Sequence, residues 1–179
     1  FSKSDQVLPN NAAWQQAFNT PGIIPVLDEQ NTQAFPDKYA TPSSIGLSTN
    51  FKNPVATAKY YDAKNELRQY MTNFYAQINL LPQKLNFKTN ISYNFQDING
   101  SVFTPTYYVS DSQQSNTTNL NKSNSQYSSY IWDNTLTYKD SYGKHNFGAM
   151  LGASMRQETY KNLWGNATGV PEGSDAYHY

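Results

Sequence analysis

Polar and apolar residues alternate with a period of two along much of the chain from Leu67 onward. In the segment 67–81, the even positions from 70 to 80 are aromatic or aliphatic except for Thr72, and the odd positions include Asn73. Alternation sustained over this length is typical of a β-strand whose two faces meet different surroundings. The pattern recurs along the chain and predicts four strands, at 67–81, 85–97, 127–138 and 145–157.

Short and long connections alternate between these predicted strands. A turn at 82–84 joins the first pair and a turn at 139–144 joins the second pair, whereas 99–126 is a long polar connection. Within it, 110–119 is of low complexity and rich in turn-forming residues, which predicts a mobile loop tip. We therefore expect an all-β chain of antiparallel strands in two tight hairpins.

The two ends of the chain show little sustained periodicity. Residues 11–18 predict a short helix with Asn10 or Asn11 as its N-cap. The rest of 1–66, in which proline is too frequent for central strands, and the segment 159–179 are expected to be loops. The chain starts at Phe1 without a signal sequence, and we expect it to be an internal piece of a longer protein.

The predicted strands are longer than the five or six residues usual in globular sheets. A transmembrane strand needs about 9–11 residues, so these strands could cross a bilayer. A soluble β-sandwich and an outer-membrane barrel both produce the alternation. Strand length, alternating connections and aromatic residues near the strand ends favour the barrel. Four strands cannot close a barrel, and lipid does not tolerate open edges, so the chain is expected to be a segment of a larger one.

In a barrel, the apolar alternate positions of each strand would face lipid and the polar alternate positions would face the lumen. The lipid-facing candidates are Tyr70, Phe74, Ile78, Phe87, Ile91, Tyr93, Trp132, Leu136, Phe147 and Leu151. The lumen-facing candidates are Lys88, Asn90, Asp133, Arg156 and Glu158. For the charged members of the second set, a network within the wall is favoured over a solute path.

Composition removes several classes of protein. The chain has 13 basic and 13 acidic residues, which argues against a nucleic-acid binder, because phosphate contacts need clustered Lys and Arg. No segment approaches 18 apolar residues, so no transmembrane helix is predicted. The absence of Cys excludes disulfides and thiolate metal sites. No catalytic motif such as HExxH, GxSxG or Walker A is present, and the sequence predicts no enzyme.

Two further groups of residues carry candidate chemistry. Asp28-Glu29 and Asp97-x-Asn99-Gly100 could supply oxygen ligands to Ca²⁺ in extracellular loops, although a turn is the favoured interpretation and no cofactor is otherwise expected. Aromatic residues outside the predicted strands could contact a ligand or a partner, with packing inside the loops as the favoured alternative. These are Trp14, Phe18, Tyr107, Tyr108 and Trp164.

The order and spacing of several short motifs resemble the SusC/RagA-like TonB-dependent outer-membrane transporters of Bacteroidetes. The resemblance extends over roughly residues 20–160. Its motifs are Ile24-Pro-Val26, Asn53-Pro54-Val-Ala56, Arg68-Gln-Tyr-Met-Thr-Asn-Phe-Tyr-Ala-Gln77, Leu85-Asn-Phe-Lys-Thr89, Trp132-Asp-Asn-Thr-Leu-Thr-Tyr138 and Gly143-Lys-His-Asn-Phe147 with Gly152.

The resemblance implies a place and a function for the chain. The family barrel is of the large, plugged 22-stranded type, so this chain would supply four neighbouring strands with long extracellular loops. Implied partners are the remainder of the transporter with its plug, a SusD-like surface lipoprotein, the TonB/ExbB/ExbD complex and membrane lipid. The implied activity is import of glycan oligosaccharides or peptides across the outer membrane. A secreted β-rich carbohydrate-binding module and a passive porin remain the alternatives.

Overall fold

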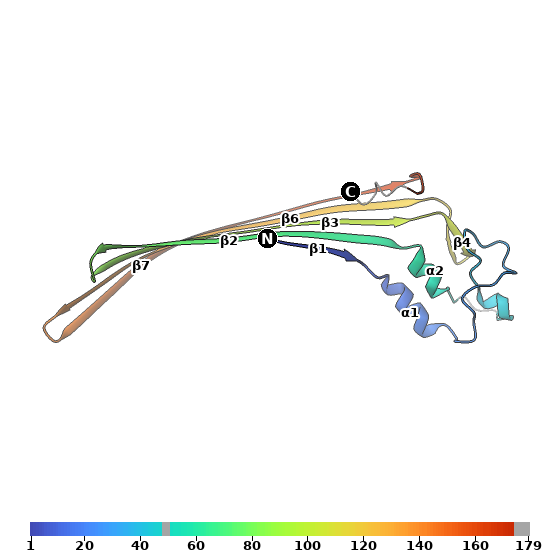
Figure 1. Cartoon of the computed structure of the whole chain (residues 1–179), viewed down its shortest axis with the longest axis horizontal. Coiled ribbons are helices and arrows are strands. Elements are labelled where there is room, and N and C mark those ends of the chain that lie inside the picture. Colours follow the sequence, from blue (N-terminus) through green and yellow to red (C-terminus); the bar gives the residue numbers. More distant parts are fainter. Residues whose placement is uncertain (48–50, 174–179) are drawn as a thin grey trace. The chain divides into compact units, whose positions relative to one another are not determined.

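The computed structural model describes residues 1–47 and 51–173. Most of them form one five-stranded sheet in the order β1-β2-β3-β6-β7 (Figure 1). The strands are β1 (Ser2–Val7), β2 (Asp62–Leu81), β3 (Leu85–Thr104), β6 (Asn119–Tyr142) and β7 (His145–Thr168). The predicted all-β class, with antiparallel strands in two hairpins, is confirmed; the described part of the chain forms no closed barrel.

The four long strands extend well beyond their predicted limits. β2 and β3 each have 20 residues, and β6 and β7 each have 24. The prediction that 99–126 and 159–179 are loops is therefore largely wrong, since β3, β6 and β7 continue into these segments. The physical reason is that strand pairing satisfies backbone groups whatever the side chains are, so polar stretches without alternation can still pair.

Tight turns close both hairpins. In the first, Gln83 takes a positive φ of 62° and the Lys84 amide donates to the carbonyl oxygen of Leu81 at 3.1 Å. In the second, Gly143 has a φ of 60°. In the turn 81–84 the positive φ lies at the second central residue, after Pro82, which is the pattern of a type II turn. In the second hairpin Gly143 is the first of two connecting residues, where a type II′ turn requires a positive φ that glycine adopts at no steric cost.

Small elements replace much of the loop expected at 1–66. They are the edge strand β1, helix α1 (Asn11–Asn19), the 3₁₀ helix η1 (Pro42–Ile45) and helix α2 (Pro54–Lys59). Helix α1 extends one residue further at its C-terminal end than predicted. Its N-cap is Asn10, whose side chain accepts a hydrogen bond from the Ala12 amide at 2.9 Å. The predicted mobile tip is instead a hairpin of β4 (Tyr107–Ser110) and β5 (Gln113–Ser115).

The contacts divide the chain into two compact units. The first, called the strand unit, contains Phe1–Ser4, Leu67–Ile98 and Asn124–Leu163, and the second, called the loop unit, contains the other described residues. Among the described residues of the strand unit, Ser129 alone is buried. The strand unit is therefore a single layer of sheet with no hydrophobic core of its own.

The loop unit has a small aromatic core. Tyr39, Ala56, Tyr60 and Val109 are buried together, and Tyr107 packs against them. The Tyr60 and Tyr107 rings are stacked with centroids 4.4 Å apart, and Tyr39 meets Tyr60 edge-on at 5.8 Å. Helix α2 and the hairpin β4–β5 thus pack on each other through tyrosines, which supply large apolar area with a polar end.

Candidate functional site

One face of the strand unit is polar, and hydrogen bonds between side chains join its neighbouring strands. Asn73 Nδ2 on β2 donates to Ser92 Oγ on β3 at 3.1 Å, and Asn86 Nδ2 donates to Asn79 Oδ1 at 2.5 Å. Odd positions of β2 and even positions of β3 therefore share this face. It is called the polar face.

The five predicted lumen-facing residues all lie on the polar face. Lys88, Asn90 and Asp133 line one hollow. Arg156 and Glu158 form an ion pair at 2.5 Å on β7, and Glu158 Oε1 also accepts from Tyr127 OH on β6 at 2.6 Å. Arg156 and Glu158 are thus paired with each other and with Tyr127 on this face.

The hollow measures about 390 Å³ and is open to one side. Three neighbouring strands line it, with residues Asn73, Tyr75, Lys88, Asn90, Asp133 and Thr135. Lys88 Nζ lies 5.7 Å from the centroid of the Tyr75 ring, a cation–π contact. Asp133 Oδ1 accepts from Ser154 Oγ of β7 at 2.5 Å. A positive and a negative group therefore lie within one polar depression.

The ten predicted lipid-facing residues lie, by strand parity, on the opposite face of the sheet, called the apolar face. A contact between strands agrees with this assignment, because the Trp132 side chain of β6 bonds to Thr89 of β3 on the apolar face. The large side chains on this face are exposed in the chain as it stands, Phe74 by 61% and Leu151 by 71%. Monomeric soluble proteins rarely expose so extended an apolar surface.

Aromatic rings cross the apolar face near one end of the apolar run. Phe1 lies 4.9 Å from Tyr70 between ring centroids, and Tyr70 lies 6.2 Å from Phe95. Two residues further along β3, Asp97 Oδ1 accepts from Asn124 Nδ2 at 2.8 Å and from Gln126 Nε2 at 3.2 Å. The face thus changes from apolar to polar immediately beyond a row of aromatic rings.

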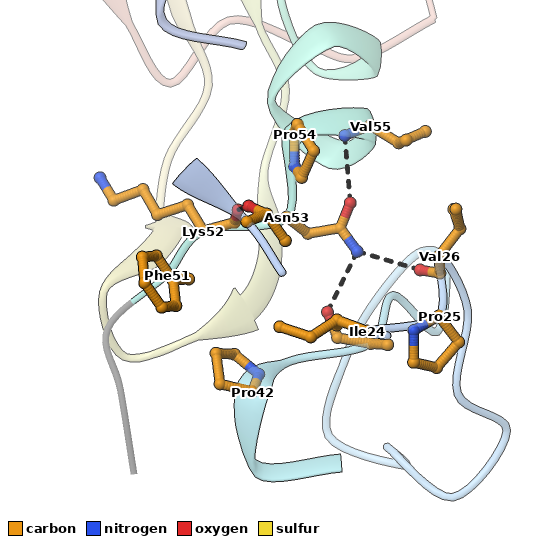
Figure 2. A pocket seen from close by; sticks show the side chains of 11 residues that line it. Ile24, Pro25, Val26, Pro42, Phe51, Lys52, Asn53, Pro54 and Val55 are labelled. Atoms are coloured by element: carbon orange, nitrogen blue, oxygen red, sulfur yellow. Dashed lines mark hydrogen bonds between the residues drawn. The ribbon is translucent and has the colours of Figure 1, made fainter. Parts of the chain in front are cut away.

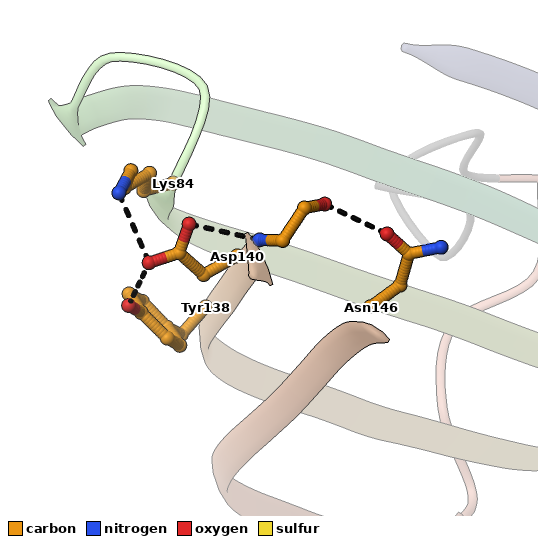
Figure 3. A network of polar contacts seen from close by, with 5 residues as sticks. Lys84, Tyr138, Asp140 and Asn146 are labelled. Carbon is orange, nitrogen blue, oxygen red and sulfur yellow. Dashed lines mark hydrogen bonds and ion pairs between the residues drawn. The ribbon is translucent and has the colours of Figure 1, made fainter. Parts of the chain in front are cut away.

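A polar network closes the other end of the strand unit (Figure 3). Asp140 Oδ2 accepts from Lys84 Nζ at 3.0 Å and from Tyr138 OH at 2.8 Å. Ser141 Oγ donates to Asn146 Oδ1 at 2.8 Å. The network ties the two hairpins together at their turns, and Tyr138 spans from the apolar face to the charged group.

A small apolar pocket in the loop unit is organised by one buried side chain, Asn53 (Figure 2). Its Oδ1 accepts from the amides of Val55 and Ala56 and so caps helix α2, which begins with Pro54. Its Nδ2 donates to the carbonyl oxygens of Val26 and Ala40, both at 3.0 Å. The pocket holds only about 60 Å³, enough for an apolar side chain and no larger ligand.

Gln113 of β5 holds the same segment from the other side. Gln113 Oε1 accepts from the Asn53 amide at 2.7 Å, and its Nε2 donates to the Asn53 carbonyl oxygen and to Thr57 Oγ1, both at 2.8 Å. Gln113 is only 3% exposed. A residue expected in a mobile tip is therefore a buried link between β5 and α2.

Asp37 connects the end of helix α2 to the aromatic core. It forms an ion pair with Lys59 at 2.9 Å and accepts from Tyr60 OH at 2.7 Å. The hydrogen bond from Lys59 and then that from Tyr60 lower the pKa of Asp37 below its usual 3.8. Burial first, and then the bond to Asp37, raise the pKa of Tyr60 well above its usual 10.0.

The five predicted aromatic contact residues separate into two groups. Tyr107 packs in the core, and Tyr108 donates its hydroxyl to Asp111 at 2.8 Å, so packing within the loop unit accounts for both. Trp14 and Phe18 project from α1 with exposed fractions of 63% and 90%. Trp164 is also exposed but lies in β7, where a loop was predicted.

The two candidate Ca²⁺ segments make ordinary protein contacts. Asp28 Oδ1 accepts from the Gln30 amide at 2.9 Å, which is an Asx-turn, and Glu29 pairs with Lys38 at 2.8 Å. Asp97 accepts hydrogen bonds from the side chains of Asn124 and Gln126 on β6. In residues 1–47 and 51–173, no group of three or more His, Cys, Asp or Glu could hold a metal ion.

Comparisons with known proteins leave the family of the chain unassigned. No protein-family model matches the sequence, and no curated protein matches it significantly. Within the part of the chain that the structure describes, no helix is both long enough and apolar enough to cross a membrane.

Several residues that organise these sites were not predicted from the sequence. Asn73, Tyr75 and Thr135 complete the hollow. Their parity was available from the alternation, but alternation does not show which positions on neighbouring strands meet. Asn53 followed by Pro54 carries the usual signal of a helix start, an N-cap before proline. Its partner Gln113 is 60 residues away, and no local pattern connects the two.

Proposed function

We propose that this chain forms part of the wall of a large outer-membrane β-barrel transporter, of the SusC/RagA-like TonB-dependent type that its motifs resemble. The observation that carries the proposal is the division of the strand unit into two exposed faces. One is joined by amide hydrogen bonds around a polar hollow, and the other is an uncovered apolar face. A barrel wall needs both faces, because lipid meets one and the lumen meets the other.

The dimensions of the apolar face support a membrane span. Its apolar and aromatic residues run from Tyr70 to Leu80 on β2, from Phe87 to Phe95 on β3, and from Phe147 to Met155 on β7. Each run has about the 9–11 residues that a transmembrane strand needs. Aromatic rings at both ends fit the girdles that flank the apolar band of such barrels.

The edges of the sheet support a larger barrel. Strand β7 is the last strand on one side of the sheet, and the six residues of β1 are too few to cover the 20 residues of β2 on the other. In lipid an unpaired edge would leave backbone groups unsatisfied. Further strands of the same protein would pair with both edges, and the 22-stranded type accommodates them.

The proposed activity is import of nutrients, glycan oligosaccharides or peptides, through the barrel. Under this proposal the hairpin turns lie in the periplasm and the loop unit lies outside the cell. The exposed side chains of Trp14 and Phe18 would face a SusD-like surface lipoprotein. The plug and the TonB/ExbB/ExbD complex would gate passage. The polar hollow would contact solute within the lumen.

Adjacent residues on β3 provide the test of the barrel. Ile91→Lys places a charge on the apolar face, whereas Asn90→Lys places the same charge on the polar face. A lysine at the lipid midplane of a barrel costs about 2–4 kcal/mol. In the intact protein, Ile91→Lys should reduce the heat-modifiable folded species in outer-membrane fractions, and Asn90→Lys should leave it unchanged. Equal effects, or extraction without detergent, would refute the proposal.

Energy coupling is tested separately from the barrel. Collapse of the proton-motive force should stop uptake through a TonB-dependent importer, because the plug opens only when energy is supplied. A passive porin would continue to conduct at the same rate. Uptake that is unaffected by the collapse would assign the chain to a porin and leave the barrel proposal intact.

A further inference from the structure

The hollow on the polar face combines two unpaired opposite charges with unused hydrogen-bond acceptors. Lys88 contacts the Tyr75 ring, and among the described residues no carboxylate lies within ion-pair distance of its ammonium. Asp133 accepts from the Ser154 hydroxyl, and no described cation pairs with it. The hollow therefore presents an ammonium and a carboxylate that retain most of their capacity to bind charge.

The neutral side chains of the hollow keep hydrogen-bond acceptors that no described residue uses. The amide nitrogens of Asn73 and Asn90 both point at Ser92 Oγ, at 3.1 and 3.5 Å. Their Oδ1 atoms accept from none of the described residues and remain available as acceptors, and each Nδ2 keeps one further N–H. Thr135 adds a hydroxyl to the lining. The hollow thus offers acceptors for N–H groups between one positive and one negative anchor.

We infer that the hollow is a binding site for a zwitterionic solute, a free amino acid or a short peptide. The Lys88 ammonium would bind the solute carboxylate, Asp133 would bind its ammonium, and the amide oxygens of Asn73 and Asn90 would accept from its N–H groups. An uncharged sugar could form hydrogen bonds to both anchors but would carry no charge to pair with either of them. The volume of about 390 Å³ lies in the range of small-molecule sites. This inference rests on the proposed function, since it treats the polar face as the lumen wall.

A matched set of probes separates the two anchors. Triglycine carries both charges, N-acetyl-triglycine lacks the ammonium, triglycinamide lacks the carboxylate, and maltotriose has no charge. Calorimetric titration of the intact protein in detergent micelles measures each affinity. Triglycine should bind most tightly, and loss of either terminal charge should weaken binding about tenfold or more, as expected for a charge-assisted hydrogen bond.

Single variants assign each terminal charge of triglycine to one residue. Lys88→Gln should weaken triglycine about tenfold and leave triglycinamide unchanged, because that probe lacks the group that Lys88 binds. Asp133→Asn should weaken triglycine similarly and leave N-acetyl-triglycine unchanged. Lys161→Gln, at an exposed position of β7 outside the hollow, is the matched control and should change neither.

A charge exchange gives the decisive outcome. Lys88→Asp or Asp133→Lys alone should abolish triglycine binding, and the two together should restore it, because the solute can bind in the reverse orientation. Equal affinity for triglycine and maltotriose, or variants without effect, would overturn the inference and leave Lys88 and Asp133 as wall residues. The proposed function survives that result if the unchanged protein is still extracted only by detergent and Ile91→Lys impairs its assembly more than Asn90→Lys; it fails as well if those two tests fail.

Discussion

Trp132 and Thr89 meet on the apolar face from neighbouring strands, where the indole Nε1 donates to the threonine Oγ1 at 2.9 Å. The contact places the polar end of a large ring against a hydroxyl within an otherwise apolar surface. In the proposed lipid environment no water would be available as an alternative partner for either group. The pair therefore allows a tryptophan on the apolar face without an unsatisfied donor.

Removal of the acceptor should destabilise the protein in a way that depends on the indole. Thr89→Val leaves Nε1 without a partner and should lower the free energy of unfolding in lipid vesicles by about 1–2 kcal/mol. Thr89→Ser keeps the hydroxyl and should cost less. In the Trp132→Phe background, Thr89→Val should have almost no effect; an equal loss in both backgrounds would show that the hydrogen bond is not responsible.

The buried link between β5 and α2 makes Gln113 far more sensitive than its neighbour. Gln113→Ala removes three hydrogen bonds to Asn53 and Thr57 and leaves buried backbone groups unpaired. We expect a loss of about 1–3 kcal/mol in the free energy of unfolding of the loop unit, or more if the partners cannot find water. Gln114→Ala, at the exposed next position, should change it by less than about 0.5 kcal/mol. Similar effects at both positions would refute the buried link.

Acid should weaken the loop unit through Asp37. Because the folded state lowers the pKa of this carboxyl, the ion pair and hydrogen bond stabilise folding above the usual value of 3.8. That contribution is lost as the pH falls from 3.8 through the lower folded value. Asp37→Asn should therefore reduce the melting temperature at pH 6, and the difference from the unchanged protein should shrink by pH 2.5.

Glu29→Gln is the control for this pH effect, since Glu29 forms an exposed ion pair with Lys38 at 2.8 Å. It should change the melting temperature little at either pH, because exposed ion pairs contribute little. A difference between Asp37→Asn and the unchanged protein that stays constant from pH 6 to pH 2.5 would contradict the assigned role of the Asp37 carboxylate.

The strand cores were predictable because alternation is a local signal. Positions such as Phe74 and Ile91 alternate with Asn73 and Asn90, and this gave both the strands and their two faces. The same signal fails beyond the apolar face. Residues 119–126 are polar at nearly every position, so the start of β6 carries no period of two although its backbone pairs like the rest of the strand.

Contacts that join distant segments were not predictable in this way. The hollow brings Tyr75, Lys88 and Asp133 together from three strands, and strand register decides which of their positions meet. The position of Gln113 in a Gln-, Ser- and Asn-rich run indicated a loop, because composition does not show which polar side chains find buried partners. Such a run is ordered here by one side chain that bonds to a segment 60 residues earlier.

Spin labels placed one at a time along β2 would show which face of the sheet meets lipid. The chain contains no cysteine, so single cysteines from Tyr70 to Leu80 can each carry one nitroxide without competing sites in this segment. In reconstituted protein, we expect even positions such as Phe74 to be accessible to oxygen and odd positions such as Asn73 to be accessible to an aqueous nickel chelate. The two accessibilities should alternate out of phase along the strand. High chelate accessibility at even and odd positions alike would show that the apolar face meets water and that the strands do not line a membrane barrel.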